Sequence, residues 1–430
     1  MARGKKKENL TPEERLQAVL VPDWKQPYKV PENWCWVHLL DSFENCTNSK
    51  KKIPQKEYLQ GGKIAVVDQG QDLVGGYTNN EEMVFAGNLP IIIFGDHTRC
   101  IKYIDFPFAQ GADGVKVLKP KQFFNSKAFY YAFQTVEIPN MGYRRHFPLF
   151  DRYAIPVPPL PEQQRIVDRI ESLFAKLDEA KQKAQDALDS FETRKAAILH
   201  KAFTGELTAQ WRKEHDYNLN WEEYTIGDLF SHTTGKALKK GNTTGTLHKY
   251  ITTSNLYWGR FDFSEVREMY FTDKELEKCT AKKGDLLVCN GGDVGRSAVW
   301  IYDYDICLQN HISKLRPKIG DISVRFFYYF FLNSKNKGYI NGRGIGISSL
   351  SAKDLLSIKV LLPTLLEQTE IVRILDDLLA KEQQAKEAAE AVLEQIDLIK
   401  KSILARAFRG KLGTNDPAEE SAVDLLKESM

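Results

Sequence analysis

The chain contains two copies of one segment. Residues 162–207 align without a gap on residues 367–412, an offset of 205 positions, and 18 of the 46 aligned positions are identical. Two helices rich in Ala, Lys and Glu share some of these residues by chance. Chance does not explain a common ending of the form Ile-Leu-x-(Lys/Arg)-Ala-Phe-x-Gly-x-Leu. An internal duplication of this kind predicts two equivalent halves, and every other pattern has to fit them.

Each copy is predicted to form one long helix, because neither Gly nor Pro interrupts it before the shared Ala-Phe ending. Pro161 suits the opening turn of the first helix, where a missing N–H costs nothing. Thr364, with Glu367 three residues later, forms a capping-box pattern at the start of the second. Gly205 and Gly410 are the expected stops, since a left-handed residue at a helix end is cheapest without a Cβ.

The apolar residues of both helices follow alternating steps of four and three, which predicts a coiled coil rather than a surface helix. At ~1.5 Å per residue each helix is roughly 60–65 Å long. Two such helices in one chain most simply pair with each other, and the ~150 residues between them allow an antiparallel arrangement. The predicted seam consists of Ile166, Ile170, Leu173, Leu177, Phe191, Ile198, Ile371, Leu375, Leu378, Val392, Ile396 and Ile403.

The segment before each helix is predicted to be a module of mixed α/β structure. Short β-rich runs lie between Gly, Asn and Asp turns, and each module then has an aromatic stretch that we expect to be helical and buried. The two modules also resemble each other loosely, for example at Asn33-Trp34 and Asn220-Trp221. The expected strands are 63–68, 91–94, 100–104, 250–253, 286–289 and 298–302, and the aromatic stretches are 123–133 and 326–331.

Composition limits the class of protein. At 430 residues the chain exceeds one typical domain, and a net charge of +3 means that any nucleic-acid site must come from local patches. Six cysteines without a CxxC pair predict reduced thiols rather than a metal site. The basic N-terminus is not followed by an apolar segment, and no run of ~18–20 apolar residues occurs. We therefore expect a soluble, cytoplasmic protein without a membrane partner.

One arrangement occurs twice, at 155–163 and 360–368. A hydrophobic segment that contains Pro leads into a Glu-Gln pair, and a long helix that ends in Ala-Phe-x-Gly-x-Leu follows. This arrangement resembles the specificity subunits of type I restriction–modification systems. The segments 283–288, 308–311 and 348–355 are similar to the target-recognition domains of that family, whereas 147–153 departs from its pattern. The resemblance covers nearly the whole chain.

The resemblance implies a pseudo-twofold duplication in which two target-recognition domains are joined by two long helices that form an antiparallel coiled coil. Each domain would read one half of a bipartite, asymmetric site in double-stranded DNA. The helices would set the spacing of the halves and dock two adenine-N6 methyltransferase subunits, and motor-nuclease subunits would complete the restriction enzyme. S-adenosylmethionine, ATP and Mg would belong to those partners and no cofactor to this chain. The implied divisions are an extension at 1–28, domains at 29–158 and 217–362, helices at 159–210 and 363–412, and an acidic tail at 413–430.

Candidate DNA-binding residues are polar or basic side chains on predicted loops. Gln pairs with adenine and Arg with guanine through two hydrogen bonds, while Lys neutralises phosphate and Gly admits a close backbone. Ordinary hairpin turns and solvated charges remain the alternative for each. In the first module the candidates are Gln69, Gln71, His97, Thr98, Arg99, Arg144, Arg145 and His146. In the second they are Lys236, Lys239, Lys240, Lys249, Thr253, Ser254, Asn255, Asn290, Arg296, Ser297 and Arg343.

Neither enzyme motif that would compete with this interpretation is present. An adenine methyltransferase needs (Asp/Asn)-Pro-Pro-(Tyr/Phe), but the single Pro-Pro pair, Pro158-Pro159, lies between Val and Leu. A translocase needs GxxxxGK(S/T), which the sequence lacks. We therefore expect a non-catalytic subunit. The alternatives are a DNA-recognition subunit of a related phage-defence system and a structural coiled-coil scaffold.

Overall fold

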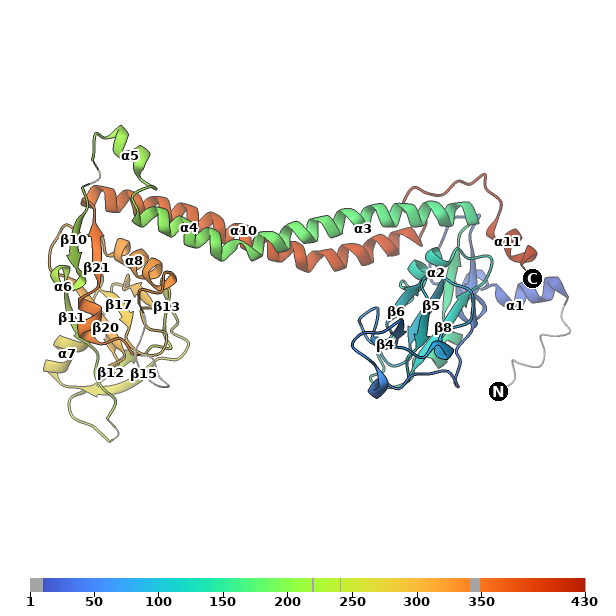
Figure 1. The fold of residues 1–430 in the computed structure, drawn as a ribbon, viewed down its shortest axis with the longest axis horizontal. Coiled ribbons are helices and arrows are strands. Elements are labelled where there is room, and N and C mark those ends of the chain that lie inside the picture. The colour runs from blue at the N-terminus through green and yellow to red at the C-terminus, as the bar shows by residue number, and fades with distance from the viewer. Residues whose placement is uncertain (1–10, 219, 240, 341–348, 430) are drawn as a thin grey trace. The chain divides into compact units, whose positions relative to one another are not determined.

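The computed structural model describes residues 11–218, 220–239, 241–340 and 349–429 (Figure 1). The chain divides into two compact units. The first contains residues 1–184 together with 391–430, and the second contains residues 185–390. Each unit therefore holds one module, the beginning of the helix that follows it, and the end of the other long helix. Among the described helices, none is both long and apolar enough to cross a membrane.

The first unit is built from short strands and a few helices around one main apolar core (Figure 1). Its strands are β1 (Cys35–His38), β2 (Phe43–Asn45), β3 (Ile64–Val67), β4 (Gly76–Thr78), β5 (Ile91–Gly95), β6 (Ile101–Ile104), β7 (Phe108–Gln110), β8 (Val115–Pro120) and β9 (Ala154–Val157). Its helices are α1 (Pro12–Val19), α2 (Ser126–Phe133), the first part of α3 (Leu160–Asp189), the last part of α10 (Leu365–Ala407) and α11 (Ala422–Glu428). Short 3-10 turns are η2 (Asp23–Lys25), η3 (Leu39–Asp41), η4 (Gln55–Glu57), η5 (Glu81–Met83) and η6 (Phe147–Arg152).

The second unit follows the same plan. Its strands are β10 (Glu222–Thr225), β11 (Phe230–Thr234), β12 (Thr246–Ile251), β13 (Leu256–Tyr257), β14 (Arg260–Phe261), β15 (Arg267–Phe271), β16 (Thr280–Ala281), β17 (Leu286–Cys289), β18 (Ser297–Val299), β19 (Ile306–Leu308), β20 (Ile312–Pro317) and β21 (Lys359–Leu362). Its helices are α4 (Phe191–Phe203), α5 (Ala209–Glu214), α6 (Ile226–Leu229), α7 (Asp273–Cys279), α8 (Val324–Asn336), α9 (Ala352–Leu356) and the first part of α10. The aromatic stretch 326–331 lies in α8, whereas only 126–133 of the first stretch form α2 and Phe123 and Phe124 precede that helix. Most of these aromatic side chains are buried in the two cores, as predicted.

Sheet topology confirms that the modules are copies. The antiparallel order β2-β8-β5-β6 in the first unit corresponds to β11-β20-β17-β18 in the second. A second sheet in each unit has a central strand with one parallel and one antiparallel neighbour: β3 between β7 and β4, and β12 between β19 and β15. The strand that opens each module pairs with the strand that precedes the long helix, β1 with β9 and β10 with β21. Equivalent loops therefore leave equivalent strands in both units.

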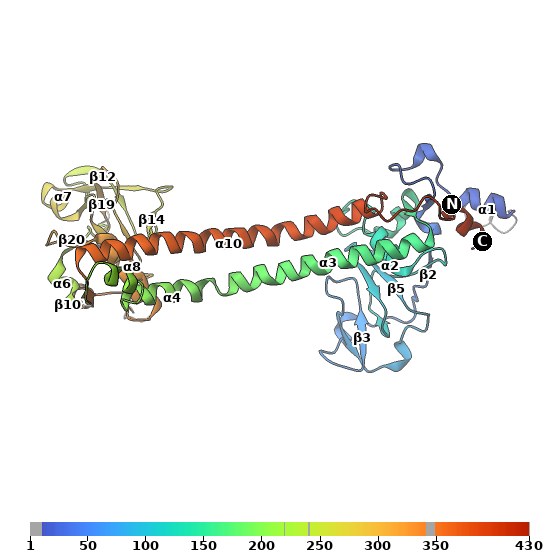
Figure 2. The same ribbon diagram turned by 90° about the horizontal axis from the view of Figure 1, so that it is seen from above.

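The long helices run antiparallel within each unit, and Figures 1 and 2 show α10 beside α3 in the first and beside α4 in the second. In the first unit Lys400 Nζ lies 2.5 Å from Asp178 Oδ1, and in the second Arg194 Nε lies 2.9 Å from Glu382 Oε2. The first helix is not continuous as predicted. It breaks at Ser190, whose hydroxyl donates to the carbonyl oxygens of Asp186 and Ala187, so the side chain competes with the helix for backbone acceptors.

Most of the predicted seam is buried or half-buried. Ile166, Ile170, Ile371, Leu375 and Ile396 are at most 3% exposed, and Phe191 is 7% exposed. Half-buried positions are Leu173, Leu177, Ile198, Leu378 and Ile403. Val392 is 40% exposed, and the half-buried residue there is its neighbour Leu393.

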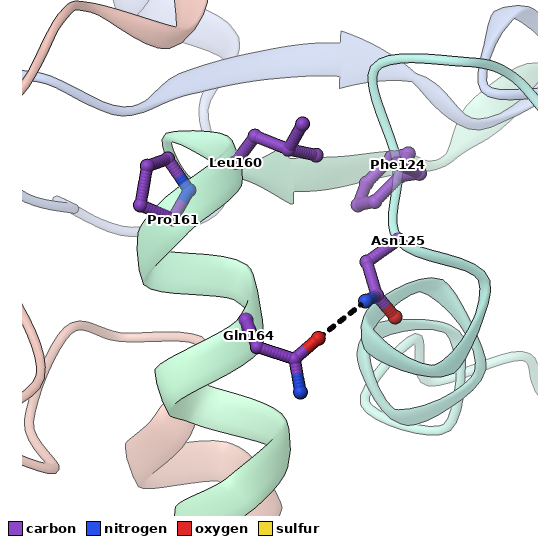
Figure 3. A pocket seen from close by; sticks show the side chains of 5 residues that line it. All are labelled: Phe124, Asn125, Leu160, Pro161 and Gln164. Carbon is purple, nitrogen blue, oxygen red and sulfur yellow. Dashed lines mark hydrogen bonds between the residues drawn. The ribbon is translucent and has the colours of Figure 1, made fainter.

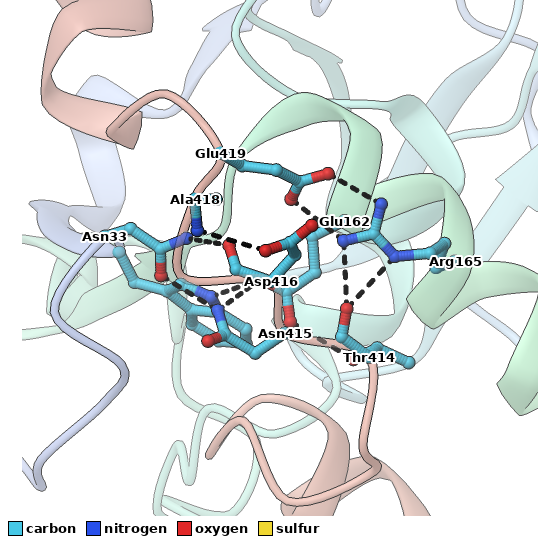
Figure 4. Close-up of polar contacts among 9 residues, drawn as sticks. Asn33, Glu162, Arg165, Thr414, Asn415, Asp416, Ala418 and Glu419 are labelled. Carbon is cyan, nitrogen blue, oxygen red and sulfur yellow. Dashed lines mark hydrogen bonds and ion pairs between the residues drawn. The ribbon is translucent and has the colours of Figure 1, made fainter.

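A buried carboxylate fastens the first helix to its module (Figure 4). Glu162, in the first turn of α3, accepts hydrogen bonds from Trp34 Nε1 at 2.6 Å, Asn415 Nδ2 at 2.9 Å and Thr414 Oγ1 at 3.1 Å. The two last donors follow the end of α10, so the clamp joins the start of one long helix to the end of the other. Beside the clamp, the Arg165 guanidinium donates two hydrogen bonds to the Glu419 carboxylate.

The second unit repeats this clamp, but there one of the donors to the glutamate is a cation. Glu367, in the first turn of α10, accepts from Trp221 Nε1 at 3.0 Å, from Thr208 Oγ1 at 2.7 Å and from the buried guanidinium of Arg212. Thr208 and Arg212 follow the end of α4. The predicted capping box is therefore only half formed: Thr364 Oγ1 accepts from the Glu367 N–H, while the Glu367 carboxylate turns into the clamp.

The glutamine beside each clamp glutamate ties the long helix to the aromatic helix. Gln163 Oε1 accepts the backbone N–H of Asn125, the N-cap of α2, and Gln368 Oε1 accepts that of Ser323, the N-cap of α8. In the first unit a further bond, from Asn125 Nδ2 to Gln164 Oε1 at 3.0 Å, crosses an open surface depression beside Leu160 and Pro161 (Figure 3). Gly205 and Gly410 end the helices in left-handed conformation, at φ 79° and 68°, as expected.

Helices α1 and α11 contribute to the core of the first unit. Leu16 and Val19 of α1 and Ala422 and Leu426 of α11 are buried in the cluster that also contains Ile166 of α3. The N–H of Ala422 donates to the carbonyl of Asn33 at 2.9 Å. Neither segment carried a resemblance in the sequence.

Candidate nucleic-acid interface

Three loops meet at one edge of the first module. The loop after β3 contains Gln69, the loop after β5 contains His97 and Thr98, and a third loop spans residues 140–146. Gln69 Oε1 accepts the His97 N–H at 3.2 Å, and Thr98 Oγ1 donates to the Gln69 carbonyl at 2.6 Å. His97 Nδ1 lies 3.0 Å from the carbonyl oxygen of Tyr143. The structure thus brings together residues from three separate parts of the sequence.

The second module joins the equivalent two loops. The loop after β12, which corresponds to β3, contains Thr253, and the loop after β17, which corresponds to β5, contains Arg296. Arg296 Nη2 donates to the Thr253 carbonyl at 2.6 Å, and its guanidinium lies over the ring of Tyr257, 5.3 Å from the centroid. Different side chains therefore hold the same pair of loops together in the two modules.

Asn290 belongs to the same edge. Its Nδ2 donates to Ser313 Oγ at 3.1 Å and to the carbonyl of Asn310 at 3.3 Å, so the segment 309–311 lies beside the loop after β17. The backbone of Lys236 is bound to that segment through the Asn310 N–H. An added Cβ on Gly291 would lie 2.9 Å from His311 Nδ1, so this glycine allows the close approach.

Several predicted side chains are occupied inside the protein. Asn255 is 5% exposed, and its amide makes four hydrogen bonds, two with Thr252 in the same turn and two to the carbonyls of Asp262 and Glu265. His146 is fully buried, with Nδ1 at the Asp96 carbonyl and Nε2 accepting the Met141 N–H. Lys236 Nζ binds Glu275 and the Tyr270 carbonyl. These contacts, with the full burial of Ser297, favour structural roles at those positions.

The other predicted residues differ in exposure. Arg99 is half-buried, takes a left-handed φ of 62° and donates to the Ile138 carbonyl at 3.0 Å. Exposed candidates are Gln71, Thr98, Arg144, Arg145, Lys239, Lys249 and Ser254. Lys240 and Arg343 lie outside the described residues.

The sequence reasoning missed two parts of this edge. Tyr143 lies directly before the predicted Arg144 and Arg145 and is 85% exposed. The segment 309–311 had been noted for its family resemblance but contributed no candidate. For Tyr143 the available signal was its position beside Arg144 and Arg145.

The cysteines are not activated as nucleophiles. Burial raises the pKa of all six thiols, to about 12 for Cys35 and to about 11 for Cys289 beside the Asn290 loop. A thiol with a raised pKa stays protonated at neutral pH and is a poor nucleophile. None of the six forms a disulfide.

Comparison with known proteins identifies the family. The profile of the type I restriction modification DNA specificity domain matches residues 31–188 and 218–395, which is more than half of the chain. The protein therefore belongs to this family. The two matches fall on the two copies inferred from the repeat.

Individual relatives agree with this assignment. The specificity subunit of the type I restriction enzyme EcoKI from Escherichia coli K12 is 26% identical over 278 residues, which cover 63% of this chain and 60% of the relative. That of StySPI from Salmonella potsdam is 26% identical over 280 residues, with the same coverage. The matched part of the chain thus spans about 60% of the length of these curated relatives.

Solved structures share the fold. The HsdS subunit from Thermoanaerobacter tengcongensis superposes with a TM-score of 0.60 at 17% identity, covering 90% of this chain and 99% of that one. A chain from a structural study of complex assembly and conformational transition in a type I R-M system gives 0.59 at 17% identity, with 90% and 100% coverage.

Proposed function

We propose that the chain is the sequence-recognition subunit of a type I restriction–modification complex and that each module reads one half of a bipartite site in double-stranded DNA. The observation that carries this proposal is the recurrence of the same loop pair in both modules. Gln69 and His97 join the loops in the first, and Thr253 and Arg296 join them in the second. Equivalent scaffolds with different side chains on equivalent loops are what a reader of two unlike half-sites requires.

In this proposal the chain carries no catalytic group. The antiparallel helices set the distance between the half-sites and dock two adenine-N6 methyltransferase subunits, and motor-nuclease subunits join to form the restriction enzyme. S-adenosylmethionine, ATP and Mg are held by those partners, and the complex acts in the cytoplasm. The raised pKa values of the six thiols argue against a cysteine nucleophile in this chain.

Methylome sequencing tests the function directly. A host that expresses this chain with its methyltransferase subunit is expected to show methylated adenines in one bipartite motif, two short specific halves separated by a fixed non-specific spacer. The methyltransferase subunit expressed alone is the control and should give no such motif. Methylation in a single continuous motif, or none with both subunits present, contradicts the proposal.

The spacing role has its own test in the same assay. One heptad inserted in both helices, after Ala187 and after Val392, keeps the seam in register and adds about 10 Å, roughly three base pairs of DNA. The two half-sites should stay the same while the spacer between them changes. A four-residue insertion after Ala187 alone is the matched control, because it breaks the seam and should cost folding or assembly. An unaltered spacer with full activity would rule out a ruler.

A further inference from the structure

The first module presents one aromatic ring to solvent at the centre of its loop cluster. Tyr143 is 85% exposed, although contact of the apolar faces of a tyrosine ring with water is energetically unfavourable. One face of the ring is covered: it stacks on the His97 imidazole with a centroid separation of 4.7 Å and an interplanar angle of 14°. The other face is therefore the exposed one.

The loop that carries Tyr143 is held rigidly from below. Its far end is fixed by the buried His146, whose N–H and Nδ1 both lie 2.8 Å from the Asp96 carbonyl. The Phe147 N–H donates to Asp96 Oδ1 at 2.7 Å, and the Met141 N–H donates back to His146 Nε2 at 3.1 Å. None of these hydrogen bonds involves the Tyr143 ring, so they remain available to the loop when the ring is removed.

The surroundings of the ring are basic. Arg144 and Arg145 follow it and are exposed. Gly142, directly before the ring, takes a left-handed φ of 66°, and an added Cβ there would meet no atom within 4 Å. The glycine thus serves the sharp turn that lifts Tyr143 out of the surface. A rigid aromatic ring, backed on one face and followed in sequence by two exposed arginines, has the chemistry of a stacking platform for a nucleobase.

We propose that Tyr143 is a base-stacking residue of the first module. Its free face stacks on a base that has been drawn out of the duplex stack in or next to the half-site read by that module, and Arg144 and Arg145 contact the flanking phosphates. Proteins that insert a side chain at a base step unstack it in this way. The inference rests on the proposed DNA-reading function and adds to it a specific contact.

The test uses the full chain assembled with its methyltransferase subunits and duplexes that carry the motif found by methylome sequencing. The fluorescent base 2-aminopurine replaces single bases of the first half-site and its borders, leaving out the methylated adenine. Its fluorescence rises when a base loses its neighbours in the stack. The wild-type complex should give such a rise at one position, and no rise at any position overturns the proposal.

Substitutions then assign the effect to the ring. Tyr143→Ala should abolish the rise and weaken binding roughly 5- to 150-fold, the range expected for loss of one base–aromatic stack. Tyr143→Phe keeps the ring and should keep both properties. Trp24→Ala removes an aromatic of similar exposure, 83%, from η2 in the same unit and should change neither.

The outcomes separate the two proposals. If Tyr143→Ala binds and fluoresces like the wild type, or Tyr143→Phe fails as badly as Tyr143→Ala, Tyr143 is not a stacking residue and the DNA-reading function stands. If the wild-type complex shows no preference for the motif over a scrambled duplex, the proposed function itself is wrong.

Discussion

The two modules differ where they face solvent and agree where they face their cores. In the first, the loop after β5 holds the 140–146 loop through the Asp96 carbonyl and the His146 N–H. In the second, the Asn290 carbonyl in the loop after β17 likewise accepts the backbone N–H of Leu350. The supporting bond is made by the backbone in both cases, and a backbone bond does not restrict the side chains. Duplicated scaffolds can therefore diverge in what their loops contact without losing the loops' positions.

The clamps at the helix starts differ in a second way. Glu162 is fully buried and its three donors are uncharged, from Trp34, Thr414 and Asn415. Glu367 is 3% exposed and faces the guanidinium of Arg212, itself 8% exposed. The same helix entry thus uses neutral hydrogen bonds in one unit and a buried ion pair in the other. Removing the carboxylate charge should have unequal consequences.

Exchange of a whole module gives the largest expected effect. Replacing residues 29–158 by the equivalent module of another family member should change one half of the methylated motif completely and leave the other half unaltered. Replacing 217–362 should do the reverse. Motif mapping by methylome sequencing measures both. A change in both halves from either exchange would show that the modules do not read independently, despite their separate cores.

Neutralising the two clamp glutamates, Glu162 and Glu367, should destabilise the two units by different amounts. Glu367→Gln leaves Arg212 as an unpaired buried cation and should destabilise the second unit by about 3–5 kcal/mol. Glu162→Gln leaves no cation, but its amide N–H₂ faces donors and should cost the first unit about 1–3 kcal/mol. Hydrogen exchange, measured peptide by peptide, should show faster opening at the start of α10 in one variant and of α3 in the other.

Glu179→Gln supplies the control for these variants, since that carboxylate is 67% exposed in its pair with Lys183 and should change stability by less than about 0.5 kcal/mol. Equal losses in Glu162→Gln and Glu367→Gln would mean that the ion pair adds nothing beyond the hydrogen bonds. A loss of protection in the opposite unit would contradict the division of the chain into two units.

Much of the architecture was predictable because it repeats and because it is periodic. The 205-residue offset predicted two copies, and the sheet topologies agree with it. The steps of four and three predicted helices whose buried face contains Ile166, Ile170, Ile371 and Leu375. The preference for glycine at helix ends also predicted the left-handed conformations of Gly205 and Gly410. Patterns of this kind depend on spacing along the chain, which the sequence states directly.

What the sequence did not give depends on partners distant along the chain. The Glu-Gln pair was visible as a motif, but its role needed Trp34, Thr414 and Asn415, which lie 128 to 253 residues away from Glu162. Asn255 and His146 have the right side chains for reading DNA, yet both make their hydrogen bonds to backbone groups inside their modules. Tyr143 acquires its candidate role only because His97 covers one of its faces. Sequence alone determined the repeat, the helices and the family; tertiary structure decided which polar side chains remain free, because burial and hydrogen bonding are settled by long-range contacts.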